Sequence, residues 1–521
     1  MSQSEPRRSS ARAKRVAGRR KVRRPTFEIQ VGESCDEPTL LQRLKLASVA
    51  GVPGLVVSLA AHFLILLVMA LVVIVQPDHE EVRLDLGWSV PKAQKKPVAP
   101  RRSFRLETEL SPPKNSKKVT KNEEKKEDDS AVVAVRPADV EKSLSGRGER
   151  LRGAILSQYG DGDKIERAIS SGLTWLKRQQ RSDGHWQLQV KNRNLGYPDP
   201  GYPDAGYVGL KTDTGATALA LLAYLGDGQT HHAGAYQETV GKGLRWLKCI
   251  QKNNGDLHDW DEQGRSTAFY AHSQATIALC EAYALTSDES LREPAERAVK
   301  FLIDAQHPTK GGWRYQPQNE RAESDLSVTG WGLMALNTAR IAGLDVPDEA
   351  FQRVSIFLDS VQESGGSQYK YLPSASADSV TAAMTAEGLL CRQWLGRPKD
   401  DPPMKLGAEF VLQPEHAPEW APGKRNVYRW YYTSQFLHNL GGESWKQWFQ
   451  SAAQQIVSMQ SRRGSRKRGA DVKGSWHPTN PTGSRHEYAE QGGRLYVTVM
   501  CLLILETPFR HASVYPDGQT P

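Results

Sequence analysis

Apolar and polar residues follow two alternating patterns along the second two thirds of the chain. The first is an amphipathic helix followed by Gln, a turn containing Gly and an aromatic residue, as in "GLTWLKRQQRSDGHW" at 172–186. Apolar side chains at helical spacing give such a helix one buried face. Looser copies of the unit stand at 243–260, 298–313, 354–371, 407–420 and 452–476.

The units recur at a nearly constant spacing. Their marker glutamines are Gln180, Gln251, Gln306, Gln362, Gln413 and Gln460. Self-similarity at a period of a few tens of residues is typical of repeat architectures. In each unit we expect Gly to end the helix in a left-handed conformation, Gln to bond the last carbonyls, and the aromatic residue to pack on the next unit.

The second pattern lies between the units and is richer in small residues and poorer in charge. It occupies residues 212–226, 270–285, 324–343, 379–396, 427–442 and 492–507. Small side chains let helices approach closely, as an inner ring requires. Six outer helices alternating with six inner ones predict an all-α fold, an (α/α)6 toroid, over residues 159–515.

The N-terminal part predicts a membrane anchor. Residues 54–75 are 22 residues without a formal charge, enough to cross a bilayer as one helix, and we place the transmembrane segment at 51–77. Residues 1–50 form a basic tail, and acidic residues follow the span. The positive-inside rule therefore predicts a single-pass protein of the inner (cytoplasmic) membrane, with a cytoplasmic N-terminus and an exported toroid. The tail carries no folded nucleic-acid-binding motif, so no nucleic-acid partner is expected.

Residues 78–158 differ in composition from everything after them. They are rich in Pro, Lys and Glu and nearly free of large apolar side chains. Such a segment cannot bury enough surface to offset the entropy of ordering it, so a disordered, extended linker is predicted.

Two polar residues, Ser58 and His62, stand inside the predicted span. An ionisable group there suggests a function. The Ser-x-x-x-His pattern in a single N-terminal anchor, followed by a Pro/Lys-rich linker, resembles the energy-transducing TonB family, and the resemblance implies coupling to a proton-driven membrane complex. The alternative is a neutral His62 bonded to a neighbouring helix. The sequence identifies no protein partner.

The pattern Trp175-Leu-x3-Gln180-x3-Gly184-x-Trp186 resembles the QW repeat of squalene cyclases and of the protein prenyltransferase β subunit. The resemblance covers about residues 160–515 and implies the toroidal fold. A shared fold does not imply a shared reaction.

Class II terpene cyclases protonate an alkene with the central Asp of Asp-x-Asp-Asp. Here the matching inner-helix start contains Asp325 at the central position, Glu323 for the first Asp and Leu326 for the last. The resemblance implies Asp325 as general acid, assisted by Glu323. The other interpretation is that Asp325 or Ser324 caps the helix. Zinc-dependent prenyl transfer is not expected, since the helices carry no Asp-x-Cys, and no metal or cofactor is predicted.

Other polar and aromatic residues of the inner helices are candidates to line a ligand site. They are His272, Thr329, Asp378, Glu387, Tyr428, Trp430, Tyr431, Gln435, His438, Arg494 and Tyr496. Asp325, Asp378 and Glu387 also offer a pair of carboxylates for polysaccharide hydrolase or lyase chemistry. Each candidate has a structural alternative, as a helix cap or a satisfied core residue.

The incomplete acid motif favours a binding or scaffold role over catalysis. The alternatives are terpenoid cyclisation by Asp325 and polysaccharide cleavage, so the expected ligand is hydrophobic or a polysaccharide. Five cysteines without a Cys-x-x-Cys pair predict neither a zinc ribbon nor a thioredoxin-type site. Cys280, Cys391 and Cys501 fall in apolar helices and are predicted core residues, while a Cys249–Cys280 disulfide is a minor alternative.

Overall fold

The computed structural model describes residues 144–188, 212–258, 267–317, 323–462 and 472–515 of the chain. The predicted tail, the predicted transmembrane helix with Ser58 and His62, and the predicted linker up to residue 143 lie outside these residues.

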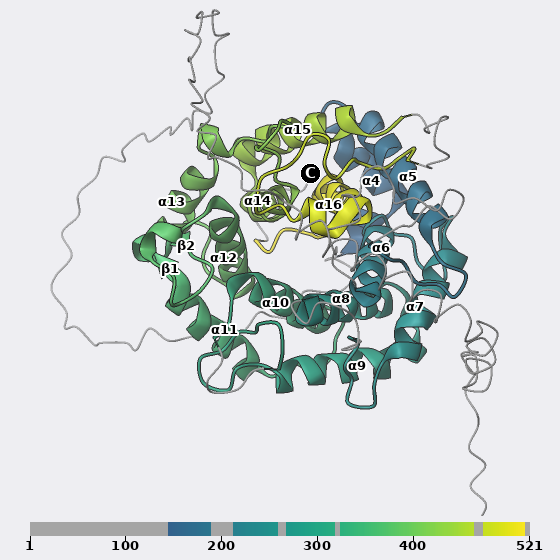
Figure 1. The fold of residues 1–521 in the computed structure, drawn as a ribbon, viewed down its shortest axis with the longest axis horizontal. Helices are drawn as coiled ribbons and strands as arrows, with labels where there is room; N and C mark the ends of the chain where they lie inside the picture. The colour runs from purple at the N-terminus through teal and green to yellow at the C-terminus, as the bar shows by residue number, and fades with distance from the viewer. Residues whose placement is uncertain (1–143, 189–211, 259–266, 318–322, 463–471, 516–521) are drawn as a thin grey trace, which may run out of the picture. The chain divides into compact units, whose positions relative to one another are not determined.

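Twelve helices, from α5 to α16, alternate between an outer and an inner layer (Figure 1). The outer helices are α5 (Gly162–Gln179), α7 (Gln237–Ile250), α9 (Glu289–Asp304), α11 (Asp348–Val361), α13 (Pro402–Val411) and α15 (Gly442–Met459). The inner helices are α6 (Asp213–Gly226), α8 (Ala268–Thr286), α10 (Leu326–Ile341), α12 (Ala382–Trp394), α14 (Val427–Leu440) and α16 (Ala489–Arg510).

The inner helices form a closed ring. Each packs against the next one along the chain, and α16 packs against α6. Each outer helix packs on the inner helix that precedes it in the ring, and α5 packs on α16. The (α/α)6 toroid is thereby confirmed, and the six predicted inner stretches coincide with the six inner helices.

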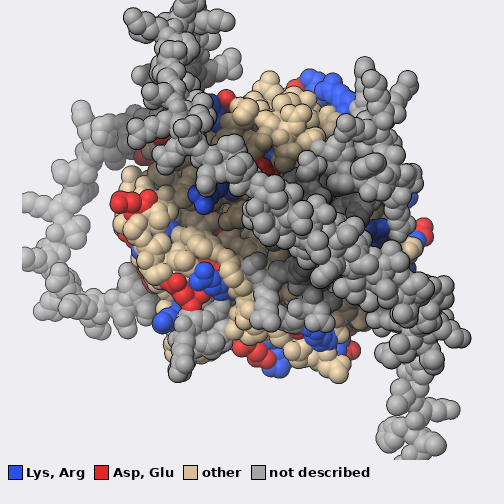
Figure 2. Space-filling view, viewed as in Figure 1, with Lys and Arg blue, Asp and Glu red and all other residues tan. Residues whose placement is uncertain are grey.

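The two layers differ in how they are buried. The outer helix α5 buries one stripe, which includes Ile165, Ile169 and Leu176, whereas α6 is buried from Thr214 to Gly226 on every side. A helix that is buried all round needs small residues where neighbours approach. On the face shown in Figure 2, the charged atoms lie mostly along the outer margin of the described surface, as expected for the polar sides of outer helices.

The turns after α5, α7, α9 and α15 bring the chain close to the next outer helix. Gly184, Gly255, Gly311 and Gly474 all have positive φ, between 68° and 107°. A Cβ atom at any of these positions would collide with a backbone carbonyl of the following outer helix, such as that of Lys242 or Arg297. Glycine is therefore required both for its conformation and for this approach. The helix itself ends earlier than expected, at the residue before the marker glutamine in α5.

The marker glutamines bond the next outer helix, which corrects the expectation that they bond only their own helix end. Gln180 Nε2 donates to Gly184 O and to Thr239 O of α7, both at 2.9 Å. Gln251 donates in the same way to Pro294 O of α9 at 2.8 Å, and Gln306 to Ala350 O of α11 at 3.0 Å. Gln460 donates to Ala168 O of α5 at 2.8 Å and so joins the last outer helix to the first.

The aromatic residue of the unit lies between the layers of its own hairpin, and the Trp186 ring also lies against Gly243 of the next outer helix, as predicted. The Trp186 indole donates to Leu176 O of α5 at 2.7 Å, and its backbone N–H donates to Thr217 Oγ1 of α6 at 3.0 Å. Trp313 and Trp476 repeat both bonds in their own hairpins. These three fully buried indoles link α5 to α6, α9 to α10 and α15 to α16.

The helical domain begins before the predicted boundary at 159. Residues Ser145–Arg147 form the 3-10 helix η1, and Glu149–Ser157 form α4. Both pack against α16. In η1 the buried side chain is Arg147, and in α4 the buried side chains are Ile155 and Leu156. The smaller elements are a two-stranded antiparallel sheet, β1 (Gln362–Glu363) with β2 (Gln368–Tyr369), and the 3-10 helices η3 (Ser364–Gly366), η4 (Ala377–Ser379) and η5 (Pro414–His416).

The apolar character of α16 belongs to the core. Within the described ranges, α16 is the one helix whose length and composition would let it cross a membrane, and 94% of its most apolar window is buried. Cys280, Cys391 and Cys501 are buried and unpaired, which confirms them as core residues and excludes the Cys249–Cys280 pairing.

Candidate functional site

The N-terminal ends of the inner helices meet at one end of the ring. Six tyrosines and two carboxyls gather there, and we call this group the tyrosine–carboxyl cluster. Its members are Asp325, Glu387, Tyr270, Tyr315, Tyr371, Tyr428, Tyr488 and Tyr496. Asp325, Glu387 and Tyr428 are buried, whereas the other five tyrosines are partly or well exposed, so the cluster reaches solvent through phenol rings.

Asp325 is the N-cap of α10 and also a buried acid. Its Oδ1 accepts a hydrogen bond from the backbone N–H of Val328 at 2.8 Å, so the predicted cap is confirmed. Its Oδ2 lies 3.7 Å from Arg314 Nε. Burial outweighs both the bond and the cation, and raises the pKa of Asp325 to about 7. Burial therefore favours the protonated form of this carboxyl.

Glu387 lies within α12 and faces hydroxyl groups. The Tyr428 hydroxyl donates to Glu387 Oε2 at 3.0 Å, and Ser327 bonds the same tyrosine hydroxyl. Burial raises the pKa of Glu387 well above its ordinary value, although the Tyr432 and Tyr428 hydroxyls oppose the shift. Gly330 of α10 leaves room for this carboxyl, since a Cβ atom there would collide with Oε1. Burial therefore favours the protonated form of the Glu387 carboxyl.

Tyrosines from five segments of the chain surround the two acids. The Tyr315 and Tyr371 hydroxyls lie 2.8 Å apart, and the rings of Tyr270 and Tyr315 are 6.4 Å apart. Burial raises the pKa of Tyr270, Tyr371, Tyr428 and Tyr496, so these phenols stay neutral donors and acceptors.

A buried ion pair holds the last part of the cluster in place. Arg425 Nε and Nη2 each lie 2.8 Å from one oxygen of Glu487, and both side chains are fully buried. Glu487 also accepts from the backbone N–H of Val427 at 3.0 Å and, through its carbonyl, from the Tyr496 hydroxyl at 3.1 Å. The pair fixes the segment before α16, where Tyr488 stands exposed with a left-handed backbone (φ 59°).

Of the residues proposed from the sequence, the structure brings Asp325, Glu387, Tyr428 and Tyr496 together in the cluster. Glu323 lies at its edge, where it accepts from the backbone N–H of Ser374 at 2.8 Å and faces Arg314 at 3.8 Å. Tyr431 lies deeper inside the ring, stacked on Trp331 at 5.7 Å, and Gln435 is beside it.

The other proposed residues lie elsewhere and have structural contacts. His272 accepts from Leu257 N–H and contacts Ala298 O of α9, and Thr329 accepts from Trp313 N–H. Trp430 packs toward Trp420 at 6.0 Å. The three remaining residues are the exposed Asp378 on η4, His438 against Trp445, and the buried Arg494, which donates to Ser475 Oγ.

The sequence interpretation missed Tyr270, Tyr315, Tyr371, Tyr488 and Arg425. Two of them carry a signal that could have been used. Tyr315 and Tyr371 each stand two residues after the buried aromatic residue of their unit, Trp313 and Tyr369. The chain there has turned toward the ring axis, since Trp313 pairs with Asp325 and Tyr371 O accepts from Leu326 N–H at 3.0 Å.

The donor atoms of a metal-ligand set occur away from the cluster. In the ranges that the structure describes, His231, His232 and Asp288 form such a group, where α6 and α8 end. The cluster itself lies where inner helices begin, a helix length of roughly 20 Å away.

No family model and no curated protein matches this chain. Solved structures similar to it include an inactive α-1,6-mannanase variant of Salegentibacter bound to α-1,6-mannotriose, at 8% identity and a TM-score of 0.46, covering 66% of this chain and 98% of the other. A type II terpene cyclase from Scytonema has 13% identity and a TM-score of 0.41, covering 67% and 97%. An unsaturated glucuronyl hydrolase specific for heparin has 13% identity and a TM-score of 0.43, covering 67% and 96%. The α/α toroid rests on the chain's own helix contacts.

Proposed function

We propose that the toroid is a ligand-binding module which a membrane anchor presents on the exported side of the inner membrane. Its ligand is a neutral molecule with apolar ring or chain surfaces and oxygen atoms, held at the tyrosine–carboxyl cluster. The anchor (residues 54–75) and the side of the membrane remain predictions from the sequence.

The observation that carries the proposal is the position of the buried Glu387 carboxyl, which accepts a hydrogen bond from the Tyr428 hydroxyl and whose pKa is raised by burial. A protonated carboxyl donates one hydrogen bond, as a phenol does, and neither attracts a charged ligand strongly. Phenol rings offer apolar faces beside these donors, the usual combination in small-molecule sites. Tyr488 supports the same location, because left-handed backbone in a non-glycine residue is costly and occurs preferentially at functional sites.

The test is a binding measurement on the full chain in detergent, with neutral oligosaccharides and squalene as separate probes. We expect one probe class to bind, and Tyr428→Phe to weaken binding about tenfold, because it removes one hydrogen bond to a buried carboxyl. Tyr283→Phe is the matched control. Tyr283 lies near the C-terminal end of α8, away from the cluster residue Tyr270, so this variant should bind as the unmodified chain does. Equal affinity of the Tyr428 variant and the control would place the ligand elsewhere.

A second candidate function is terpenoid cyclisation with Asp325 as general acid. It is favoured by the burial and raised pKa of this carboxyl, since an acid must be protonated to donate. The α10 cap bond weighs against it, because the bond from Val328 N–H stabilises the ionised form. Incubation with squalene should then give cyclic products that vanish in Asp325→Asn. Product analysis with oligosaccharides would likewise reveal cleavage by Asp325 and Glu387.

Coupling through the anchor stays a separate proposal from the sequence. His62→Ala should abolish a proton-driven function and leave ligand binding by the toroid unchanged. An effect of Asp325→Asn alone would assign the function to the toroid.

A further inference from the structure

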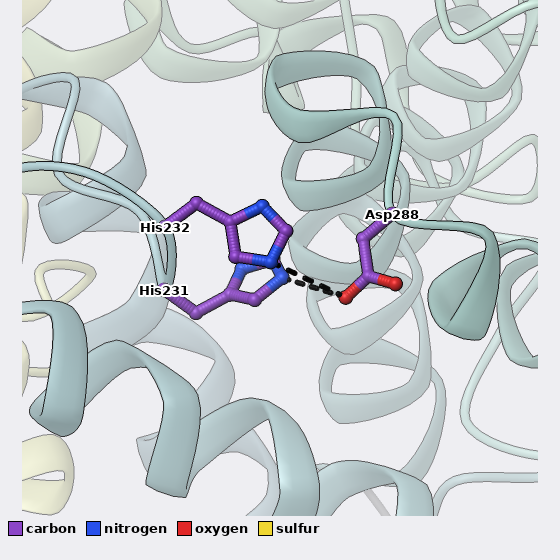
Figure 3. A group of neighbouring side chains, drawn as sticks. All are labelled: His231, His232 and Asp288. Carbon is purple, nitrogen blue, oxygen red and sulfur yellow. Dashed lines mark hydrogen bonds and ion pairs between the residues drawn. The ribbon is translucent and has the colours of Figure 1, made fainter.

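Two adjacent histidines face an aspartate across two loops on the outside of the toroid. His231 and His232 lie in the loop between α6 and α7, and Asp288 lies directly before α9 (Figure 3). His231 Nε2 is 2.8 Å from Asp288 Oδ2, and His232 Nε2 is 3.8 Å from the same oxygen. The figure shows both rings turned toward the carboxylate.

The backbone holds these side chains in place. The Thr230 hydroxyl accepts hydrogen bonds from His232 N–H at 3.2 Å and Ala233 N–H at 2.8 Å, which fixes the turn carrying the histidines. Asp288 Oδ1 accepts from Ser290 N–H at 2.9 Å as the cap of α9. That bond fixes the Asp288 carboxylate and leaves Oδ2 directed toward the histidines.

The spacing of the donor atoms suits a small cation. One donor atom from each residue can be chosen so that all three lie within 4.8 Å of one another. A tetrahedral zinc ion with bonds of about 2.0–2.1 Å holds its ligand atoms roughly 3.3 Å apart. The distances of 2.8 and 3.8 Å lie on either side of that value. Small shifts of the two rings would bring both distances to Asp288 Oδ2 to that value.

We propose that His231 Nε2, His232 Nε2 and Asp288 Oδ2 bind a divalent transition metal ion of the zinc type, with water in the remaining positions. Two imidazoles and one carboxylate suit Zn²⁺ or Co²⁺, whereas Ca²⁺ and Mg²⁺ prefer oxygen ligands alone. His232 is more than half exposed, so water reaches the open side. Lys248 lies nearby and bonds Ser290, and its charge opposes the metal and lowers the affinity.

His232 separates a metal site from an ordinary hydrogen bond. The short contact between His231 and Asp288 ties the two loops together without any metal. His232 adds only an exposed, 3.8 Å ion pair, which contributes little to stability in water. Metal binding therefore requires His232, whereas the hydrogen bond between His231 and Asp288 does not.

The experiment uses the full chain in detergent, purified without a histidine tag and dialysed against a chelator. Titration with Zn²⁺ by calorimetry should give one ion per chain, and Co²⁺ should give visible absorption typical of nitrogen and oxygen ligands. Saturating Zn²⁺ should raise the melting temperature, because the ion binds only the folded loops.

His232→Ala should weaken Zn²⁺ binding at least tenfold and abolish the metal-dependent rise in melting temperature, while the metal-free melting temperature stays unchanged. His486→Ala, another exposed histidine, is the matched control and should bind as the unmodified chain does. Asp288→Asn keeps an N-cap and should also lose the ion. Absence of bound Zn²⁺, or equal binding by the His232 variant, would overturn the proposal.

Discussion

Asp325 shows how one residue can serve a local and a tertiary role. Its position before an apolar helix predicts an N-cap, and the bond to Val328 N–H confirms it. The burial that raises its pKa to about 7 comes from other parts of the chain, including the Tyr371 segment. Sequence position therefore identified the residue, whereas its acidity depends on neighbours that are distant in sequence.

Replacing Asp325 should change how stability depends on pH. The folded protein keeps a proton on this carboxyl up to about pH 7, whereas the unfolded chain loses it near the ordinary value of 3.8. Stability contributed by the proton is complete below about pH 4 and is lost as the pH rises through about 7. Urea unfolding should show this loss, of the order of a few kcal/mol at 1.4 kcal/mol per pH unit.

Asp325→Asn should reduce this pH dependence, because Asn keeps the cap and cannot ionise. Asp227, with a pKa raised to about 6, acts in the same direction and remains in both proteins. The difference between the two unfolding curves therefore isolates Asp325. The exposed Asp378→Asn variant should follow the unmodified chain, and a parallel pH profile for Asp325→Asn would contradict the assigned burial effect.

At the scale of elements, the repeated unit contains both the helices and the glutamines that link neighbouring outer helices. Apolar spacing and the small-residue stretches predicted every inner helix, because both are local properties of the chain. The partner of each marker glutamine was not predictable in this way. The Gln460 amide reaches Ala168, 292 residues earlier, and such a bond exists only when the ring is closed.

Gln460→Leu should lower the free energy of unfolding by about 1–3 kcal/mol, because it leaves the Ala168 and Gly474 carbonyls without their side-chain donor. Gln413→Leu is the matched control. Gln413 holds the same place in a more divergent unit but is exposed, so its replacement should cost less than about 0.5 kcal/mol. Urea unfolding of the two variants at one pH measures the difference. Equal effects would show that the bond between α15 and α5 does not stabilise the ring.

At the scale of the whole domain, ion pairs close the end of the ring opposite the tyrosine–carboxyl cluster. Glu281 of α8 accepts from Arg147 of η1 at 3.1 Å and from Arg510 of α16 at 2.9 Å. Burial alone would raise the pKa of Glu281, but the two guanidinium groups overcome it and lower the pKa to about 2. The buried charges are thus paired, and the segment that joins the predicted linker to the ring is part of the domain.

Arg147→Ala should destabilise the domain by about 3–5 kcal/mol, the usual cost of removing one partner from a buried ion pair. The loss includes the bonds from Arg147 to Arg510 O and Leu225 O. Arg150→Ala, three residues later and exposed, should change stability by less than about 0.5 kcal/mol. Thermal or urea unfolding of both variants is the measurement. A small effect at Arg147 would mean that Arg510 alone satisfies Glu281.

The sequence by itself determined the helices, their alternation, the glycine turns and the helix caps, because each depends on residues within a few turns of one another. It also located Asp325 and Glu387 on inner helices. Only the tertiary structure decided that Glu387 faces Tyr428, that Arg147 pairs with Glu281, and that two histidines lie beside Asp288. Those contacts join residues 41 to 134 positions apart, and burial and charge at each of them are set by ring closure.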